Sequence, residues 1–196
     1  MDEQLKNQKY HDLVQTARNL FWKHGFRRVS IEEICKKAGV SKMTYYRFFP
    51  NKIELAKTVF DGVVEEGRQK FKELMASDIP ASEKIRGMIL MKEESTHDIS
   101  KEFLEDFYLG TQPELKAYVE EITRKVWDEM LYDFKKAQQE GVFRSDFKPE
   151  FLIHVSFKIV DMMKDENLLK LYGSPQELIM EYANFVSYGI SNREGK

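Results

Sequence analysis

The sequence predicts an all-α protein, with an N-terminal three-helix head that contains a helix-turn-helix and a larger helical C-terminal body. Three observations lead to this fold class. Apolar residues recur at helical spacing along almost the whole chain, and the alternating, β-branched pattern of strands is absent. Residues 30–55 contain successive helix caps separated by tight turns.

The first predicted helix is amphipathic and ends near Gly25. We expect this helix to pack beneath the two short helices that follow and to complete the head. One of its faces carries Tyr10, Leu13, Val14, Ala17, Leu20 and Phe21.

The second predicted helix begins at Ser30, where Ser30 and Glu33 form a Ser-x-x-Glu capping box. Ile31, Ile34, Cys35 and Ala38 fall on one face of it. Because Cys35 is the single cysteine and lies on that apolar face, we interpret it as a buried structural thiol in a reducing compartment.

A short polar helix follows the turn at Gly39, a residue type that commonly ends a helix in the left-handed conformation. Ser41 is its predicted N-cap, and Phe49-Pro50 stops it. A helix, a glycine-containing turn and a short polar helix are the layout of a helix-turn-helix that reads DNA.

A fourth helix starts near Lys52, where Asn51 and Glu54 resemble another capping box, and extends to about Met75. The remaining helices are expected over residues 82–95, 99–109, 113–140, 149–165 and 174–190.

The overall net charge of −2 conceals an asymmetry. Residues 1–52 hold 11 Lys and Arg against 5 Asp and Glu, a net charge of +6, whereas the rest hold 20 against 28, a net charge of −8. A basic head on an acidic body is typical of a local nucleic-acid contact surface. We therefore divide the chain into a DNA-binding domain, 1–52, and an acidic helical body, 53–196.

Residues 39–55 resemble the N-terminal signature of the tetracycline-repressor (TetR) family of transcriptional regulators. The matching positions are Gly39-Val40-Ser41-Lys42, Thr44, Tyr46, Phe49-Pro50, Lys52 and Leu55. The resemblance implies a one-component regulator, here read as a repressor, that binds double-stranded operator DNA as a homodimer and is released by a small-molecule effector. It also implies that residues 53–196 form the effector-binding and dimerisation domain.

Phosphate contacts are expected from two helix N-termini and from cationic or phenolic side chains. The candidates are Ser30, Ser41, Arg28, Tyr46 and Lys52, the last two on the resemblance. Base reading is expected from Lys42, Thr44 and Tyr45. Since a seven-residue helix has one free face, some side chains must pack inside. We predict Phe48 and Phe49 in the core and Tyr45 and Tyr46 on the surface.

The last two helices are apolar on two sides, so a partner chain is expected to cover one of them. The resemblance implies a four-helix dimer interface, and the competing interpretation is a pair of central helices in a monomer. The candidate interface residues are Phe151, Val155, Ile159, Met162, Leu178, Tyr182, Phe185 and Gly189.

Methionine and aromatic residues of 82–140 are candidates for an adaptable apolar effector pocket, although ordinary core is the competing interpretation for each. They are Met88, Met91, Phe103, Phe107, Tyr108, Tyr118, Trp127 and Met130. Inward-facing acidic side chains among Glu93, Glu94, Glu102, Glu105 and Asp106 would favour a cationic hydrophobic effector; a solvated acidic face is the alternative.

No catalytic motif is present in the sequence, so we do not expect an enzyme, a cofactor or a bound metal. Glu93 and His97 have a spacing compatible with a metal, but two mixed ligands are a weak signal. The absence of an apolar N-terminal segment favours a cytoplasmic protein. The alternative functions are a helical adaptor that binds protein, which would not need the basic head, or an enzyme with unmarked residues.

Overall fold

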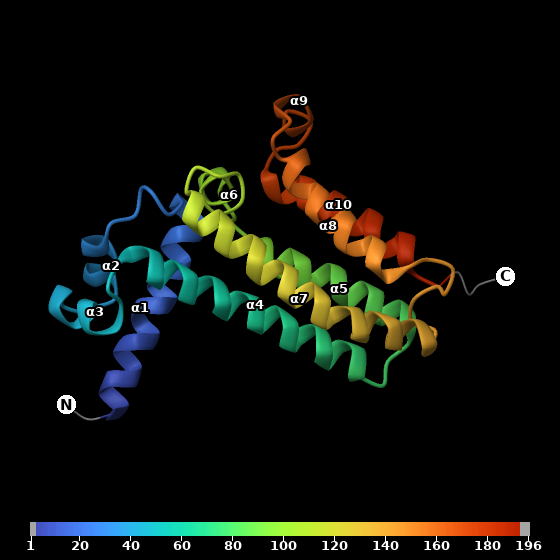
Figure 1. The fold of residues 1–196 in the computed structure, drawn as a ribbon, viewed down its shortest axis with the longest axis horizontal. Helices are drawn as coiled ribbons and strands as arrows, with labels where there is room; N and C mark the ends of the chain where they lie inside the picture. The colour runs from blue at the N-terminus through green and yellow to red at the C-terminus, as the bar shows by residue number, and fades with distance from the viewer. Residues whose placement is uncertain (1–2, 193–196) are drawn as a thin grey trace. The chain divides into compact units, whose positions relative to one another are not determined.

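A computed structural model of the chain describes residues 3–192, apart from the side chains of Glu3 and Ile153. This part of the chain is all-helical (Figure 1). The helices are α1 (Glu3–His24), α2 (Ile31–Lys37), α3 (Lys42–Phe48), α4 (Lys52–Ala76), α5 (Ala81–Thr96), α6 (Lys101–Phe107), α7 (Pro113–Gln139), α8 (Pro149–Met162), α9 (Glu166–Leu169) and α10 (Pro175–Ile190).

The predicted helices and the all-α class are confirmed, with boundaries shifted by a few residues. Helix α9 is the one that sequence reasoning missed. It has four residues, and Asp165 caps it by accepting hydrogen bonds from the backbone N–H groups of Asn167 and Leu168. A single turn has no apolar periodicity from which it could be predicted.

The chain forms two compact units. Unit 1 comprises Met1–Val63 and Asp98–Glu121, and unit 2 comprises Val64–His97 and Ile122–Lys196. Helices α4 and α7 each continue from one unit into the other. The predicted boundary at residue 52, between a DNA-binding and an effector-binding domain, differs from the boundaries of these units and stays a prediction.

Unit 1 is built around aromatic rings from α1, α4 and α6. Phe21, Phe103 and Phe107 are fully buried, and the Phe103 and Phe107 rings stack with centroids 4.4 Å apart. Phe26 and Phe60 contact the same Phe107 ring. Each buried ring contributes about 1.5–3 kcal/mol of hydrophobic free energy, so this cluster holds α6 against the head.

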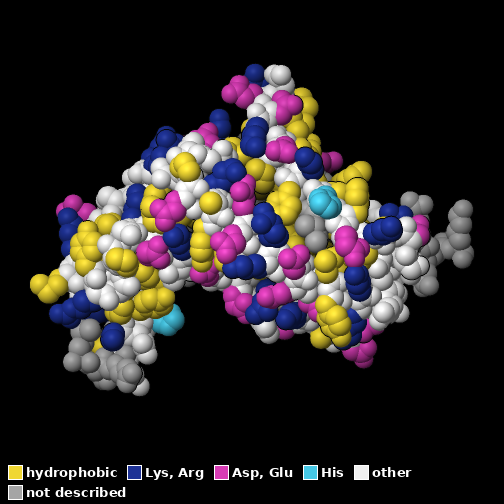
Figure 2. All heavy atoms as spheres, viewed as in Figure 1, with side chains coloured by type: hydrophobic (Ala, Val, Ile, Leu, Met, Phe, Trp, Pro, Cys, Tyr) yellow, Lys and Arg dark blue, Asp and Glu magenta, His cyan; other side chains and the backbone are white. Residues whose placement is uncertain are grey.

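Charged side chains of both signs are interleaved over α4 and α7 on the face in Figure 2. Several are paired within one unit. Lys57 of α4 contacts Glu114 of α7 at 2.9 Å in unit 1, and Arg68 contacts Glu129 at 3.1 Å in unit 2. Exposed pairs of this kind contribute little to stability, about 0–1 kcal/mol each, but they keep the outer surfaces of these helices solvated.

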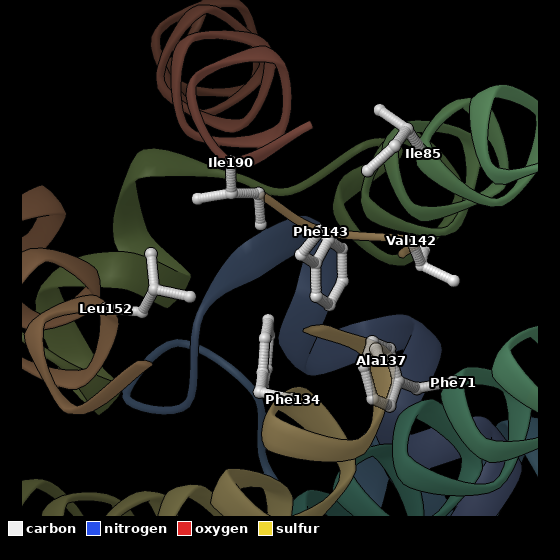
Figure 3. Packing of buried hydrophobic residues seen from close by; sticks show 8 residues of the cluster. All are labelled: Phe71, Ile85, Phe134, Ala137, Val142, Phe143, Leu152 and Ile190. Atoms are coloured by element: carbon white, nitrogen blue, oxygen red, sulfur yellow. The ribbon is translucent and has the colours of Figure 1, made fainter. Parts of the chain in front are cut away.

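Unit 2 has its own apolar core, drawn in Figure 3. Helix α10 packs along α5, and the rings of Phe71, Phe134 and Phe143 stack in succession, with adjacent centroids 5.4 and 5.2 Å apart. The segment after α7 is fixed by Gln138, whose side-chain amide donates to the carbonyls of Arg144 and Phe147. The cluster consists of Phe71, Ile85, Phe134, Ala137, Val142, Phe143, Leu152 and Ile190.

Among the described residues, no helix combines the length and the apolar character that crossing a membrane requires.

Candidate nucleic-acid interface

Helix α2 begins at the predicted cap. The Ser30 hydroxyl accepts a hydrogen bond from the Glu33 backbone N–H at 3.0 Å. Ile34 and Cys35 are buried beneath it, and burial raises the pKa of the Cys35 thiol. The interpretation of Cys35 as a buried structural thiol agrees with both facts, because a protonated, buried thiol is a poor nucleophile.

The turn between α2 and α3 depends on Gly39, whose φ is +64°. This left-handed conformation costs other residues about 1–2 kcal/mol, which is why glycine is suited to the position. Ser41 then caps α3, and its hydroxyl accepts from the Thr44 backbone N–H at 3.1 Å. The two capped helices meet across a tight turn, as the sequence predicted.

Helix α3 presents four side chains to solvent: Lys42, Met43, Tyr46 and Arg47. Met43 and Tyr46 are the apolar members of this face, with 71% and 55% of their surface exposed. Thr44 is half-buried, and its hydroxyl shares a 2.9 Å hydrogen bond with the Ser41 hydroxyl. Met43 and Arg47 were not among the predicted site residues.

Tyr45 is a correction, because the structure buries it completely. Its ring packs against Phe49, and its hydroxyl donates to the Asn51 carbonyl at 3.1 Å. Burial raises the pKa of the phenol above its usual range. Tyr45 and Phe49 are four residues apart and share one face, whereas Tyr46 is rotated about 100° away. Helical spacing alone could therefore have predicted that Tyr45 is buried and Tyr46 is exposed. Phe48, which was predicted in the core, is only half-buried.

Lys52 holds the loop between α1 and α2 from within. Its ammonium donates to the carbonyls of Phe26 and Val29, both at 2.7 Å, and lies 4.1 Å from the centroid of the Phe26 ring. Burial lowers the pKa of this ammonium, and the charge of Asp106 opposes the shift. Two of the three ammonium donors are thus used within the protein, and the phosphate contact of Lys52 stays a prediction.

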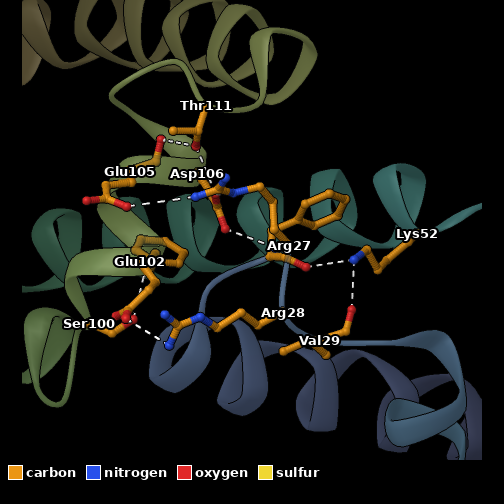
Figure 4. A network of polar contacts seen from close by, with 11 residues as sticks. Arg27, Arg28, Val29, Lys52, Ser100, Glu102, Glu105, Asp106 and Thr111 are labelled. Carbon is orange, nitrogen blue, oxygen red and sulfur yellow. Dashed lines mark hydrogen bonds and ion pairs between the residues drawn. The ribbon is translucent and has the colours of Figure 1, made fainter.

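The same loop is tied to α6 by two arginines (Figure 4). Buried Asp106 accepts from the Arg27 backbone N–H at 2.9 Å and from Arg27 Nε at 2.6 Å. Arg28 pairs with Glu102 at 3.0 Å. Gly25 permits this approach, because a Cβ at its +76° backbone would lie 2.8 Å from Glu102 Cβ. Arg28, a predicted phosphate contact, is therefore paired with α6 in this structure.

The predicted effector residues do not form one group. Phe103, Phe107 and Tyr108 lie in the aromatic core of unit 1, where burial raises the pKa of Tyr108 to about 12. Tyr118, also in unit 1, donates to Asp61 at 2.8 Å; burial and then this bond raise its pKa to about 12. The other four residues pack, partly buried, against the core of unit 2: Met88, Met91, Trp127 and Met130.

The predicted dimer residues are mostly accessible in the single chain. Phe151 of α8 is 64% exposed and Phe185 of α10 is 80% exposed, and Gly189 of α10 is also exposed. Leu178 is a correction, because it is buried within the chain on the helix that packs along α5. It therefore cannot face a partner. The remaining candidates are half-buried: Val155, Ile159, Met162 and Tyr182.

Comparison with known proteins agrees with this geometry. Residues 13–59 match the family profile described as "Bacterial regulatory proteins, tetR family". The chain is 27% identical over 140 residues to the uncharacterized HTH-type transcriptional regulator YhgD of Bacillus subtilis, covering 70% of this chain and 71% of that protein.

Two further similarities are found at lower sequence identity. The HTH-type transcriptional repressor KstR2 of Mycobacterium tuberculosis is 22% identical over 147 residues, covering 71% of this chain and 72% of that protein. A Saccharomonospora viridis regulator solved in complex with choline shares the fold with a TM-score of 0.66 at 17% identity, covering 95% of this chain and all of that one.

A capped, exposed α3 behind a glycine turn, in an all-helical chain, defines a DNA-binding transcriptional regulator of the helix-turn-helix class. Within that class, the chain belongs to the TetR family. Members of this family are not enzymes.

Proposed function

We propose that this regulator is a cytoplasmic repressor that binds a near-palindromic operator as a homodimer and is released by a small hydrophobic effector. Residues 1–52 would contact DNA, and residues 53–196 would bind the effector and the partner subunit. The observation that carries the proposal is the exposed face of α3. The helix caps and the buried Tyr45 fix the position of α3, so the side chains on its exposed face are free to contact DNA.

Base reading in this proposal belongs to Lys42, Thr44, Met43 and Arg47. Lysine and arginine donate to guanine acceptors, and methyl groups of Thr44 and Met43 suit the thymine methyl. Lys42 contacts Glu32 at 3.1 Å in this structure. Because exposed ion pairs are weak, breaking this pair to contact a base would cost little free energy. Tyr46 and the N–H groups at the start of α2 and α3 would contact phosphates.

Dimerisation is supported by the apolar surface that α8 and α10 leave exposed. Phe151 lies on α8, and Phe185 and Tyr188 lie on α10, each with more than 60% of its surface accessible. Exposed aromatic rings on two helices of the same unit are what a partner subunit would cover. Two heads in such a dimer would read half-sites roughly 34–36 Å apart, or a multiple of this distance.

Repression with effector release is supported by the relatives. KstR2 of Mycobacterium tuberculosis is named as a repressor, and the Saccharomonospora viridis regulator holds a small molecule. For release, the effector must bind more tightly to the state that does not bind DNA.

The proposal is tested by selecting bound fragments from random and genomic DNA with the purified protein. A near-palindromic winner, bound by two chains with an affinity that falls steeply with salt, is the expected result. Lys42→Ala should reduce the preference for the winner over random DNA. No enrichment at low salt, or an asymmetric site bound by one chain, would count against the proposal and favour the adaptor interpretation.

A further inference from the structure

Aromatic contacts within unit 1 hold the beginning of α1 against the end of α3. The Tyr10 ring stacks on Phe49 with centroids 5.4 Å apart and meets the Phe48 ring edge-on at 5.6 Å. Helix α1 begins at Glu3, so it continues for about two turns, or about 10 Å, before Tyr10 (Figure 1). These two turns therefore have a fixed position relative to α3.

This part of α1 carries positive charge. Residues 4–11 contain Lys6 and Lys9 and no Asp or Glu. Lys6 is exposed and lies one helical turn before Tyr10, within about 40° of it, so it extends the same side of α1 beyond the contact with α3. Exposed Arg47 precedes the Phe48 ring on α3. On the face in Figure 2, basic side chains gather over α3 and the start of α1.

The protein itself does not neutralise these cations. Neither Lys6 nor Lys9 makes a hydrogen bond or ion pair with any residue that the structure describes. Arg47 contacts only the Met43 sulfur, at 3.9 Å, among the described residues. Both glutamates of α2, the helix between α1 and α3 in sequence, pair with other lysines. The positive charge is therefore available to a ligand.

Exposed lysines are common, and Lys23 at the other end of α1 is one of them. Lys6 and Lys9 differ from Lys23 because the Tyr10 ring ties their part of α1 to the proposed base-reading helix. Each strand of a duplex has a phosphate about every 3.4 Å along the axis. A duplex held by α3 therefore has several phosphates within the distance that α1 extends.

We propose that Lys6 and Lys9 bind DNA phosphates outside the base pairs that α3 reads. These contacts extend the binding surface of each subunit onto flanking DNA of any sequence, because phosphates carry no sequence information. The proposal rests on the DNA-binding function proposed above. It adds a part of the chain that precedes residues 13–59, the range that matches the family profile.

The test is a salt titration of operator binding by the untagged, full-length protein. The selected operator is used in two lengths, one that ends at its outermost discriminated base pairs and one with ten more base pairs on each side. Each lost phosphate contact lowers the slope of log affinity against log salt by about 0.9. Lys6→Ala/Lys9→Ala should therefore lower the slope by about 3.6 for a dimer on the longer DNA, and by much less on the shorter DNA.

Two control variants separate phosphate binding from general effects of charge and folding. Lys23→Ala/Lys72→Ala removes the same charge from exposed positions, of which Lys23 lies about 25 Å along α1 from Lys6, and should leave the slope unchanged. Lys6→Arg/Lys9→Arg keeps both charges and should keep the wild-type slope. Specific and random DNA should be affected alike by every variant.

Three results would overturn the proposal while leaving the proposed function intact. They are a wild-type slope in Lys6→Ala/Lys9→Ala, an equal loss of slope in the Lys23→Ala/Lys72→Ala control, and a loss confined to one DNA sequence, which would mean that these lysines read bases. A wild-type protein that binds no DNA would overturn the proposed function, and this inference with it.

Discussion

Asp106 is the residue on which the loop before α2 depends most. Its carboxylate is buried and accepts two hydrogen bonds from Arg27, at the backbone and at Nε. The Thr111 hydroxyl shares its one proton between Asp106 at 2.8 Å and the Glu105 carbonyl at 2.6 Å. Removing this charged acceptor would leave the Arg27 donors unpaired in a buried site, which costs free energy.

Asp106→Asn is expected to lower the free energy of unfolding by about 2 kcal/mol, because it weakens charge-assisted bonds in a buried site. Glu105→Gln is the matched control, since Glu105 meets Arg27 only at 3.9 Å and should change stability by less than about 0.5 kcal/mol. Urea unfolding of both variants measures the difference, and equal losses would contradict the role given to Asp106.

Tyr45 and Tyr46 should respond differently to loss of the hydroxyl. Tyr45→Phe leaves the Asn51 carbonyl unpaired and is expected to cost about 1 kcal/mol of stability while sparing sequence preference. Tyr46→Phe should leave stability unchanged and weaken binding to specific and random DNA alike. Unfolding curves and DNA titrations of both variants test this; altered sequence preference in Tyr45→Phe would argue against its burial.

The residue scale also shows where sequence reasoning stopped. Caps such as Ser30 and Ser41 are local, so their roles follow from four consecutive residues. The burial of Tyr45 instead depends on a seven-residue helix packing on the rest of the head. The exposure of Met43 likewise could be known only from that packing.

At the scale of the element, α4 is a 25-residue helix that contains Gly62 and Gly67. A Cβ at either position would meet nothing within 4 Å. Neither glycine is therefore required by packing, and both weaken the helix near residue 63, where the chain passes from unit 1 into unit 2.

Gly62→Ala is expected to stabilise the protein by about 0.5–1 kcal/mol through helix propensity alone. Gly39→Ala is the matched comparison, because its Cβ also meets open space but its φ is +64°. It should destabilise by about 1 kcal/mol. Thermal or urea unfolding distinguishes them, and a loss of stability in Gly62→Ala would indicate a packing role that the structure lacks.

The helices could be predicted from the sequence because amphipathic periodicity is a local property. The predicted spans match α4, α5, α7 and α10 closely. The inner faces were harder to assign. Leu178 and Phe185 both belong to an apolar stripe of α10, and only the packing of α10 along α5 shows that the first is buried and the second exposed.

At the scale of the whole molecule, the long-range contacts were beyond sequence reasoning. Arg27 and Asp106 are 79 residues apart, and no pattern joins them. The eight predicted effector residues divide between two units. The sequence could not show this, because methionine and aromatic residues occur both in cores and in pockets. Fold class followed from local periodicity, but the site depends on tertiary structure.

The exposed face of α8 and α10 gives a prediction for the assembly. Phe185→Glu should leave the unfolding of the single chain nearly unchanged, separate the proposed dimer into monomers and weaken operator binding. Tyr132→Glu is the control, because Tyr132 is 73% exposed on α7 and should not affect assembly. Sedimentation velocity measures the outcome; a dimeric Phe185→Glu protein would place the interface elsewhere.

The ties between the α1–α2 loop and α6 also limit how this regulator can recombine with its relatives. A chimaera joined at residue 52 would carry Arg27 and Arg28 into a foreign body and leave Asp106 and Glu102 behind. The transplanted loop would then lack its anchors, and operator specificity would be lost through loosened geometry rather than altered base contacts. A functional graft must include residues 98–121 with the N-terminal segment, so exchange of operators between such proteins requires three crossovers.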